Sequence, residues 1–111
     1  GPGLGLDPTR LVLVGRSAGA QIATATAYAD RDPAVRAVVA LYGVHDLRFV
    51  WSLAVPDDAL NSLDLMQKLF GGGPDTFERA ARYDSASAER LAAPGVPPTL
   101  LLHGALDELV W

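Results

Sequence analysis

The sequence predicts an α/β fold in which about three parallel strands are joined by helical crossovers. Three short apolar runs, rich in branched side chains, have the composition of strands buried on both faces of a parallel sheet; they span residues 10–14, 35–42 and 99–102. Segments with helical spacing of apolar residues separate these runs, and parallel strands need such crossovers. Polar residues that follow the three strands are therefore expected along one edge of the sheet, where α/β proteins place their sites.

The helices are predicted from spacing and from the residues that begin or end them. Apolar residues at helical spacing follow the first strand as far as Tyr28. The run 56–70 predicts an amphipathic helix with Pro56 in its first turn and Gly71 at its end. Two shorter helices are expected at 74–83 and 85–93, whereas the pattern leaves 44–55 undecided.

The composition indicates one globular domain and argues against several classes of function. The chain has 111 residues, of which 50% are hydrophobic and 20% charged. Its net charge of −4, with nine scattered Lys and Arg residues, argues against a nucleic-acid partner. Because cysteine is absent, disulfides and thiolate–metal sites are excluded, and we expect neither a cofactor nor a metal. No apolar run is long enough to cross a bilayer, and neither the compartment nor the oligomeric state is fixed.

Residues 15–19, Gly-Arg-Ser-Ala-Gly, carry the most informative motif. They follow a predicted strand and precede a predicted helix, which is the context of a Gly-x-Ser-x-Gly nucleophile elbow. We expect a Cβ at Gly15 or Gly19 to strike neighbouring backbone, because the turn is sharp. Ser17 would then present its hydroxyl above the sheet, with the N–H of Ala18 facing an oxyanion.

Other functions of glycine-rich loops do not fit. A phosphate-binding P-loop needs Lys followed by Ser or Thr after its last glycine, but Ala20 and Gln21 stand there. The dinucleotide-binding fingerprint requires a different spacing from that of Gly15 and Gly19. The glycines at 71–73 are interpreted as a helix stop.

Three stretches together resemble the α/β-hydrolase superfamily, in particular its esterase and lipase branch. Residues 6–19 are similar to the strand and elbow of that family, 40–47 to the next strand and its exit, and 98–110 to the following strand and acid loop. The resemblance covers essentially the whole chain and implies a partial α/β-hydrolase fold over 1–111. We expect the chain to be an internal piece of a longer protein, truncated at both ends, because three strands do not make the larger sheet of that fold.

By this resemblance Ser17 is the nucleophile and Asp107 the acid of a Ser-His-Asp triad. Asp46 is a rival acid, although helix capping fits it better. The two histidines, His45 and His103, both precede Asp107 and so break the order Ser, Asp, His in which the triad members of this fold occur. We therefore expect the base, and the second oxyanion donor, to come from residues that this sequence does not include.

These expectations give a serine hydrolase of carboxylic esters, acting on a small-molecule substrate and inactive as the isolated 111-residue chain. Three alternatives remain open: a non-catalytic binding module, a related amidase or peptidase, and a self-contained three-stranded domain. The aromatic side chains Phe49 and Trp51 either line an acyl pocket or pack between helices, and we favour packing.

Overall fold

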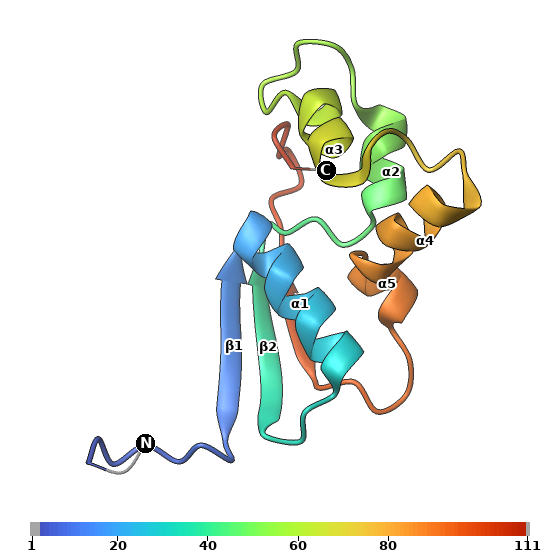
Figure 1. Cartoon of the computed structure of the whole chain (residues 1–111). Coiled ribbons are helices and arrows are strands. Elements are labelled where there is room, and N and C mark those ends of the chain that lie inside the picture. Colours follow the sequence, from blue (N-terminus) through green and yellow to red (C-terminus); the bar gives the residue numbers. More distant parts are fainter. Residues whose placement is uncertain (1–2, 111) are drawn as a thin grey trace.

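The protein is an α/β structure built on a three-stranded parallel sheet. A computed structural model describes residues 3–110. The strands β1 (Leu11–Arg16), β2 (Val35–Leu41) and β3 (Thr99–Leu102) lie in the order β1-β2-β3, so that β2 is central (Figure 1). The predicted fold class is confirmed, and the three predicted strands are present with boundaries shifted by no more than two residues.

The pairing of the strands brings their carboxyl ends level with one another. Arg16 pairs with Leu41, and Leu41 pairs with Leu102. The ladder continues by one bond on each side, from Ser17 N to Leu41 O (2.9 Å) and from Tyr42 N to Leu102 O (2.7 Å). Since neighbouring strands lie about 4.8 Å apart, the backbones of Ser17 and His103 stand about 10 Å apart along this edge.

The sheet is less buried than its apolar sequence predicts. The helix α1 (Ala18–Asp30) packs against β1 and β2. Val14 on β1 is nevertheless 67% exposed, and Leu101 on β3 is 57% exposed. The expectation that residues 10–14 and 99–102 are buried on both faces is therefore wrong for the described chain. The reason is position, because β1 and β3 are the two edge strands and only β2 carries fully buried residues, Val38 and Ala40.

Four helices follow β2 and precede β3 along the chain, and they form the larger part of the core. They are α2 (Leu47–Leu53), α3 (Ser62–Phe70), α4 (Phe77–Ser85) and α5 (Ala88–Leu91). In Figure 1, α2 and α3 stand beyond the carboxyl ends of the strands; α5 lies beside α1, and α4 packs next to α5. Buried side chains of α2, α3 and α4 form one hydrophobic cluster that consists of Leu47, Val50, Met66, Phe70 and Tyr83.

The helix predicted over 56–70 begins six residues late. Asp57 and Asn61 have φ angles of 62° and 54°, which is the left-handed region that interrupts a helix. Pro56 therefore lies in a turn, and the carboxylate of Asp58 accepts the N–H of Ser62 (2.8 Å) at the true start of α3. The predicted end is confirmed, since Gly71 caps α3 with a φ of 80°.

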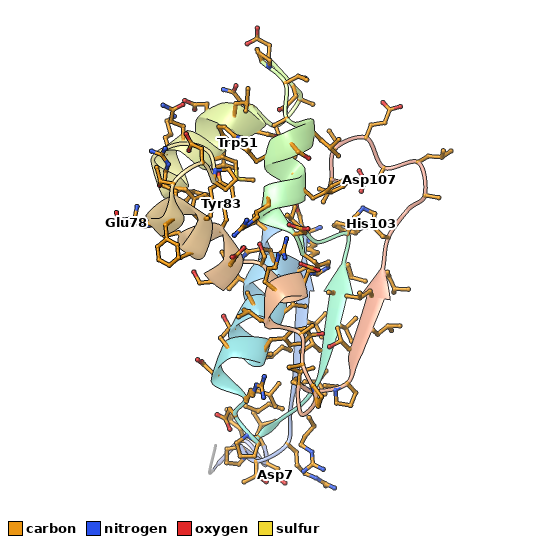
Figure 2. All side chains as sticks on the ribbon, turned by 90° about the vertical axis from the view of Figure 1, so that its right-hand side faces the viewer. Asp7, Trp51, Glu78, Tyr83, His103 and Asp107 are labelled. Atoms are coloured by element: carbon orange, nitrogen blue, oxygen red, sulfur yellow. The ribbon has the colours of Figure 1, made fainter. Side chains whose placement is uncertain are left out.

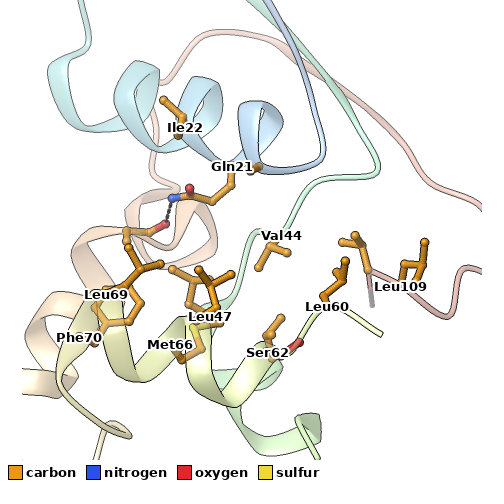
Figure 3. A pocket seen from close by; sticks show the side chains of 15 residues that line it. Gln21, Ile22, Val44, Leu47, Leu60, Ser62, Met66, Leu69, Phe70 and Leu109 are labelled. Carbon is orange, nitrogen blue, oxygen red and sulfur yellow. Dashed lines mark hydrogen bonds between the residues drawn. The ribbon is translucent and has the colours of Figure 1, made fainter. Parts of the chain in front are cut away.

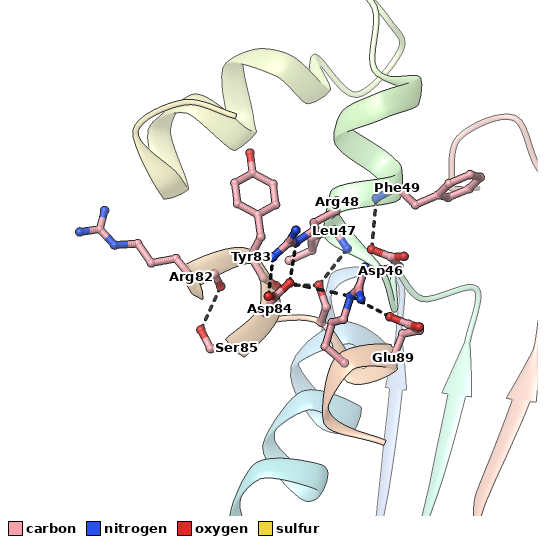
Figure 4. A network of polar contacts seen from close by, with 11 residues as sticks. Asp46, Leu47, Arg48, Phe49, Arg82, Tyr83, Asp84, Ser85 and Glu89 are labelled. Carbon is pink, nitrogen blue, oxygen red and sulfur yellow. Dashed lines mark hydrogen bonds and ion pairs between the residues drawn. The ribbon is translucent and has the colours of Figure 1, made fainter. Parts of the chain in front are cut away.

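A polar network joins α2 to the start of α5 (Figure 4). Arg48 makes two hydrogen bonds to the carboxylate of Asp84, at 2.6 and 2.5 Å. The hydroxyl of Ser87 accepts the N–H of Leu47 (2.9 Å) and donates to the carbonyl of Tyr83 (2.7 Å). The segment that leaves β2 is thus fixed in place by hydrogen bonds from α4 and α5.

Trp51 contributes to packing, as expected, and is not among the residues that line the cavity between the start of α1, α2 and α3. Its indole meets Tyr83 edge-on, with ring centroids 6.3 Å apart (Figure 2). A Cβ at Gly73 would lie 2.5 Å from the Trp51 ring. Gly73 is therefore needed for the close approach of the loop to the indole, which accounts for one of the three consecutive glycines. Phe49, by contrast, is 50% exposed.

Over residues 3–110, no helix has both the length and the apolar character that crossing a membrane requires.

Candidate active site

Ser17 lies at the corner between β1 and α1 in an unusual backbone conformation. Its φ and ψ are 52° and −124°, a combination that non-glycine residues rarely adopt. Its carbonyl accepts the first helical bonds, from Ala20 N (3.0 Å) and Gln21 N (3.2 Å). A serine before a helix ordinarily uses its hydroxyl as a cap, but the Ser17 side chain makes no capping hydrogen bond. Ser17 is exposed, and its hydroxyl is left available.

The two glycines of the motif differ in what the structure requires of them. A Cβ at Gly15 would lie 2.3 Å from the carbonyl oxygen of Gly19 and 2.7 Å from Ala20 N. The expectation of a backbone clash is therefore confirmed at Gly15. At Gly19 it is wrong, because a Cβ there would meet no described atom within 4 Å beyond its chain neighbours and the nearby backbone of its own helix. Only Gly15 lies at a close contact, because β1 passes close to the first turn of α1 there, whereas the Cβ position of Gly19 faces outward.

The first turn of α1 presents backbone N–H groups beside Ser17. Ala18 is the first residue of α1, and the first N–H groups of a helix have no intrahelical acceptor. These groups also lie at the positive end of the helix dipole. The N–H of Ala18, the residue directly after Ser17, is the first of these groups.

Asp107 is held in the loop that follows β3 by two backbone amides. Its Oδ1 accepts the N–H groups of Leu109 (2.9 Å) and Val110 (3.0 Å). The amides of Val110 and Leu109 hold the pKa of Asp107 below its ordinary value, and nearby His103 adds to this lowering. Asp107 therefore carries its charge over the whole neutral range, with Oδ1 bonded to both amides.

His103 closes the same loop. Its Nε2 lies 2.7 Å from the carbonyl oxygen of Val110 and 3.4 Å from Oδ2 of Asp107. Because a carbonyl oxygen only accepts hydrogen bonds, Nε2 of His103 carries the hydrogen in the contact with Val110. Figure 2 shows His103 at the end of β3 and Asp107 in the loop beyond it. The imidazole is used to hold the acid loop, here defined as residues 103–110.

His45 and Asp46, which follow β2, have structural partners. The hydroxyl of Thr24 donates to Ala20 O (2.8 Å), so the 3.3 Å contact between Thr24 Oγ1 and Nδ1 of His45 has the histidine as donor. Partial burial lowers the pKa of His45, and His103 lowers it further. The carboxylate of Asp46 accepts the N–H of Phe49 (3.1 Å), which confirms that Asp46 caps α2.

A cavity of about 520 Å³ adjoins the elbow (Figure 3). It is bounded by the start of α1, by α2 and α3, and by the acid loop. Its lining is apolar apart from the amide of Gln21 and the hydroxyl of Ser62. The amide of Gln21 is itself tied to the carbonyl of Ala86 (2.7 Å). The cavity reaches from Ala18 at the elbow to Leu109 and Val110 in the acid loop, so it joins the two predicted site regions.

Sequence reasoning missed this cavity and the bonds that close the acid loop. Apolar residues at helical spacing in α3 indicated a buried face, but not that part of that face lines a cavity instead of packing in a core. The contact between His103 and Asp107 had a local signal, because the two residues are four positions apart. Within residues 3–110, no group of three or more potential metal ligands comes together.

Comparison with known proteins gives one positive result. Neither the curated proteins nor the solved structures gave a match to the chain. A family model described as BD-FAE matches residues 2–111. This match agrees with the strand–Ser–helix corner and with the parallel sheet. The chain belongs to the BD-FAE family, an α/β-hydrolase-like family of esterases.

Proposed function

We propose that the chain carries the nucleophile and the acid of a serine hydrolase that cleaves carboxylic esters. Ser17 is the nucleophile, the N–H of Ala18 is one donor of the oxyanion hole, and Asp107 is the acid. The base is a histidine supplied by residues that this sequence does not include. The family match supports an esterase in general, and the assignment of these residues is our own proposal.

The conformation of Ser17 is the observation that carries this proposal. A serine that served only to cap α1 would have extended backbone angles and a bonded hydroxyl, and Ser17 has neither. Backbone strain of this kind costs about 1–3 kcal/mol and is concentrated at functional sites. A sharp, strained turn between a strand and a helix is also the geometry that exposes a nucleophilic serine.

The reaction follows from these positions. Ser17 Oγ transfers its proton to the histidine and attacks the ester carbonyl, and the resulting oxyanion is stabilised by the N–H of Ala18. The alcohol leaves with the proton returned by the histidine, and an acyl-serine remains. Water, deprotonated by the same histidine, then releases the acid. Asp107 stabilises the imidazolium that forms in each half of the reaction.

Neither histidine of this chain suits the role of base. A triad base donates from Nδ1 to the acid and receives the serine proton at Nε2. The Nε2 of His103 is instead bonded to the carbonyl of Val110, and the Nδ1 of His45 contacts Thr24 and not Asp107. Both also precede the acid in the chain, contrary to the order found in this fold. We therefore expect the chain alone to hydrolyse esters negligibly, because losing one triad member removes several orders of magnitude of rate.

The test is covalent labelling of Ser17 by a fluorophosphonate. We expect labelling when the chain is complemented with a C-terminal segment that bears the missing histidine, and none in the Ser17→Ala variant. Asp107→Asn should keep the fold and reduce the labelling rate by about 10⁴, as for the acid of other triads. If a complemented or full-length protein is not labelled at Ser17, the hydrolase proposal fails and a binding module is the better explanation.

A further inference from the structure

The acid loop bonds mainly to itself and meets the rest of the molecule across the cavity. The hydrogen bonds of its Asp107, His103 and Val110 within the described chain all end inside residues 103–110. The side chains of Leu109 and Val110 line the cavity opposite α3. Val110 is only 7% exposed, whereas Leu109 is 53% exposed and still has apolar surface that a bound group could cover.

The same two residues therefore serve two purposes. Their backbone N–H groups hold the carboxylate of Asp107, and their side chains form one wall of an apolar cavity. On the opposite wall, α3 contributes Leu65, Met66 and Leu69, of which Leu69 is 63% exposed. An apolar group between these walls would bury surface on both sides, and about 25 cal/mol of stabilisation follows for each Å² removed from water.

From this arrangement we infer that the cavity binds an uncharged apolar group of the ester, and that this group positions Asp107 by packing on Leu109. The inference rests on the proposed function, because it assigns the cavity to the substrate of the same site. A volume of about 520 Å³ is that of a site for a small organic molecule and exceeds what an acetyl group fills. Among residues 3–110, the lining offers no charged side chain to pair with an ionic substrate.

Leu109 is thereby a positioning residue, and the acid loop supplies its own control. Leu106 lies in the same loop, is 94% exposed and does not line the cavity. Replacing Leu109 with Ala removes apolar contact with the bound group without touching the backbone amides. Replacing Leu106 with Ala removes a similar side chain from the same loop but leaves the cavity wall intact.

The experiment measures binding to the Ser17→Ala variant of the chain, so that no turnover is required. Two series are compared by NMR titration, methyl esters of straight-chain acids from acetate to octanoate and acetate esters of straight-chain alcohols. We expect the affinity in one series to rise about fourfold for each added methylene, and that series identifies which side of the ester enters the cavity. Leu109→Ala should weaken binding of the longest ester, Leu106→Ala should not, and the exposed substitution Leu69→Glu should abolish the dependence on length.

A second readout separates positioning from simple binding. The pKa of Asp107, followed by its side-chain carboxyl signal, should fall further when methyl octanoate (or the corresponding acetate ester) is bound, because a better-ordered loop keeps both amides on the carboxylate. This response should be lost in Leu109→Ala and kept in Leu106→Ala. Affinity that does not depend on chain length, or equal effects of the two leucine substitutions, would overturn the inference. Failure of Ser17 labelling in a full-length protein would overturn the hydrolase proposal instead, since binding is measured without chemistry.

Discussion

Adding a methyl group should have opposite effects on stability at Gly15 and at Gly19, although the Gly-x-Ser-x-Gly motif requires glycine at both positions. A methyl group at Gly15 would lie 2.3, 2.6 and 2.7 Å from three backbone atoms of the first turn of α1. Because these are backbone atoms, no side-chain rotation relieves the overlap, and either β1 or the start of α1 must move. Bringing the nearest atom from 2.3 Å to an ordinary contact of 3.4 Å requires a displacement of about 1 Å.

Such overpacking typically costs about 1–3 kcal/mol, and we expect Gly15→Ala at the upper end because the neighbours are rigid. For a chain of this size, a loss of about 3 kcal/mol lowers the melting temperature by roughly 12 °C or more. Gly19→Ala should instead stabilise the chain by about 0.5–1 kcal/mol, since the new methyl group meets open space inside a helix.

The assay is urea unfolding of both variants beside the parent chain, followed by far-ultraviolet circular dichroism. The midpoint should fall for Gly15→Ala and stay level or rise for Gly19→Ala, with equal slopes in all three chains. Equal destabilisation by the two substitutions would refute the reasoning, because it would mean that the turn requires glycine on both sides irrespective of contacts.

Three further substitutions test the elbow, the core and the half-buried His45. Ser17→Gly should raise the free energy of unfolding by about 0.5–2 kcal/mol, because glycine relieves the backbone strain at a φ of 52° but makes the unfolded chain more flexible. A loss of stability in urea unfolding would contradict the strained geometry. Tyr83→Phe removes the hydroxyl that donates to Gly72 O (2.8 Å) and should cost about 1 kcal/mol in the same assay; an unchanged midpoint would show that this bond contributes nothing. The pKa of His45 is lowered in the folded chain, so the unfolded chain binds more protons and the free energy of unfolding should decrease as the pH falls through 6.5. In His45→Gln that slope should be shallower, and an identical pH profile for the two chains would exclude His45 as its source.

Much of the fold was predictable from the sequence because its signals are local. Three apolar runs predicted the strands, and α3 ended at Gly71, where a helix stop was expected. The start of α3 was not predictable in this way. Pro56 followed by two aspartates has the composition of a first helical turn, but the backbone at Asp57 and Asn61 adopts left-handed angles that composition does not reveal.

The sequence predicts which residues form the proposed site, but it does not predict their surroundings. The order of motifs places Ser17 and His103 at one edge of the sheet, and the pairing of Arg16, Leu41 and Leu102 confirms that placement of the backbone. The cavity depends on how far α3 stands from the acid loop, and no local pattern encodes that separation. Likewise, nothing around Gly19 in the sequence indicates that its outer face is open.

The features at Ser17 all run against local stability. Its backbone is strained, its hydroxyl forgoes the cap that α1 would otherwise receive, and β1 approaches so closely that Gly15 must lack a side chain. A corner needed only to connect a strand to a helix would be more stable with glycine at position 17, or with a serine that capped the helix. In the acid loop, the two residues whose amides bind Asp107 also line the adjoining cavity with their side chains. Stability is thus given up at Ser17 and order is concentrated around Asp107, which is the distribution that the proposed roles of nucleophile and acid require.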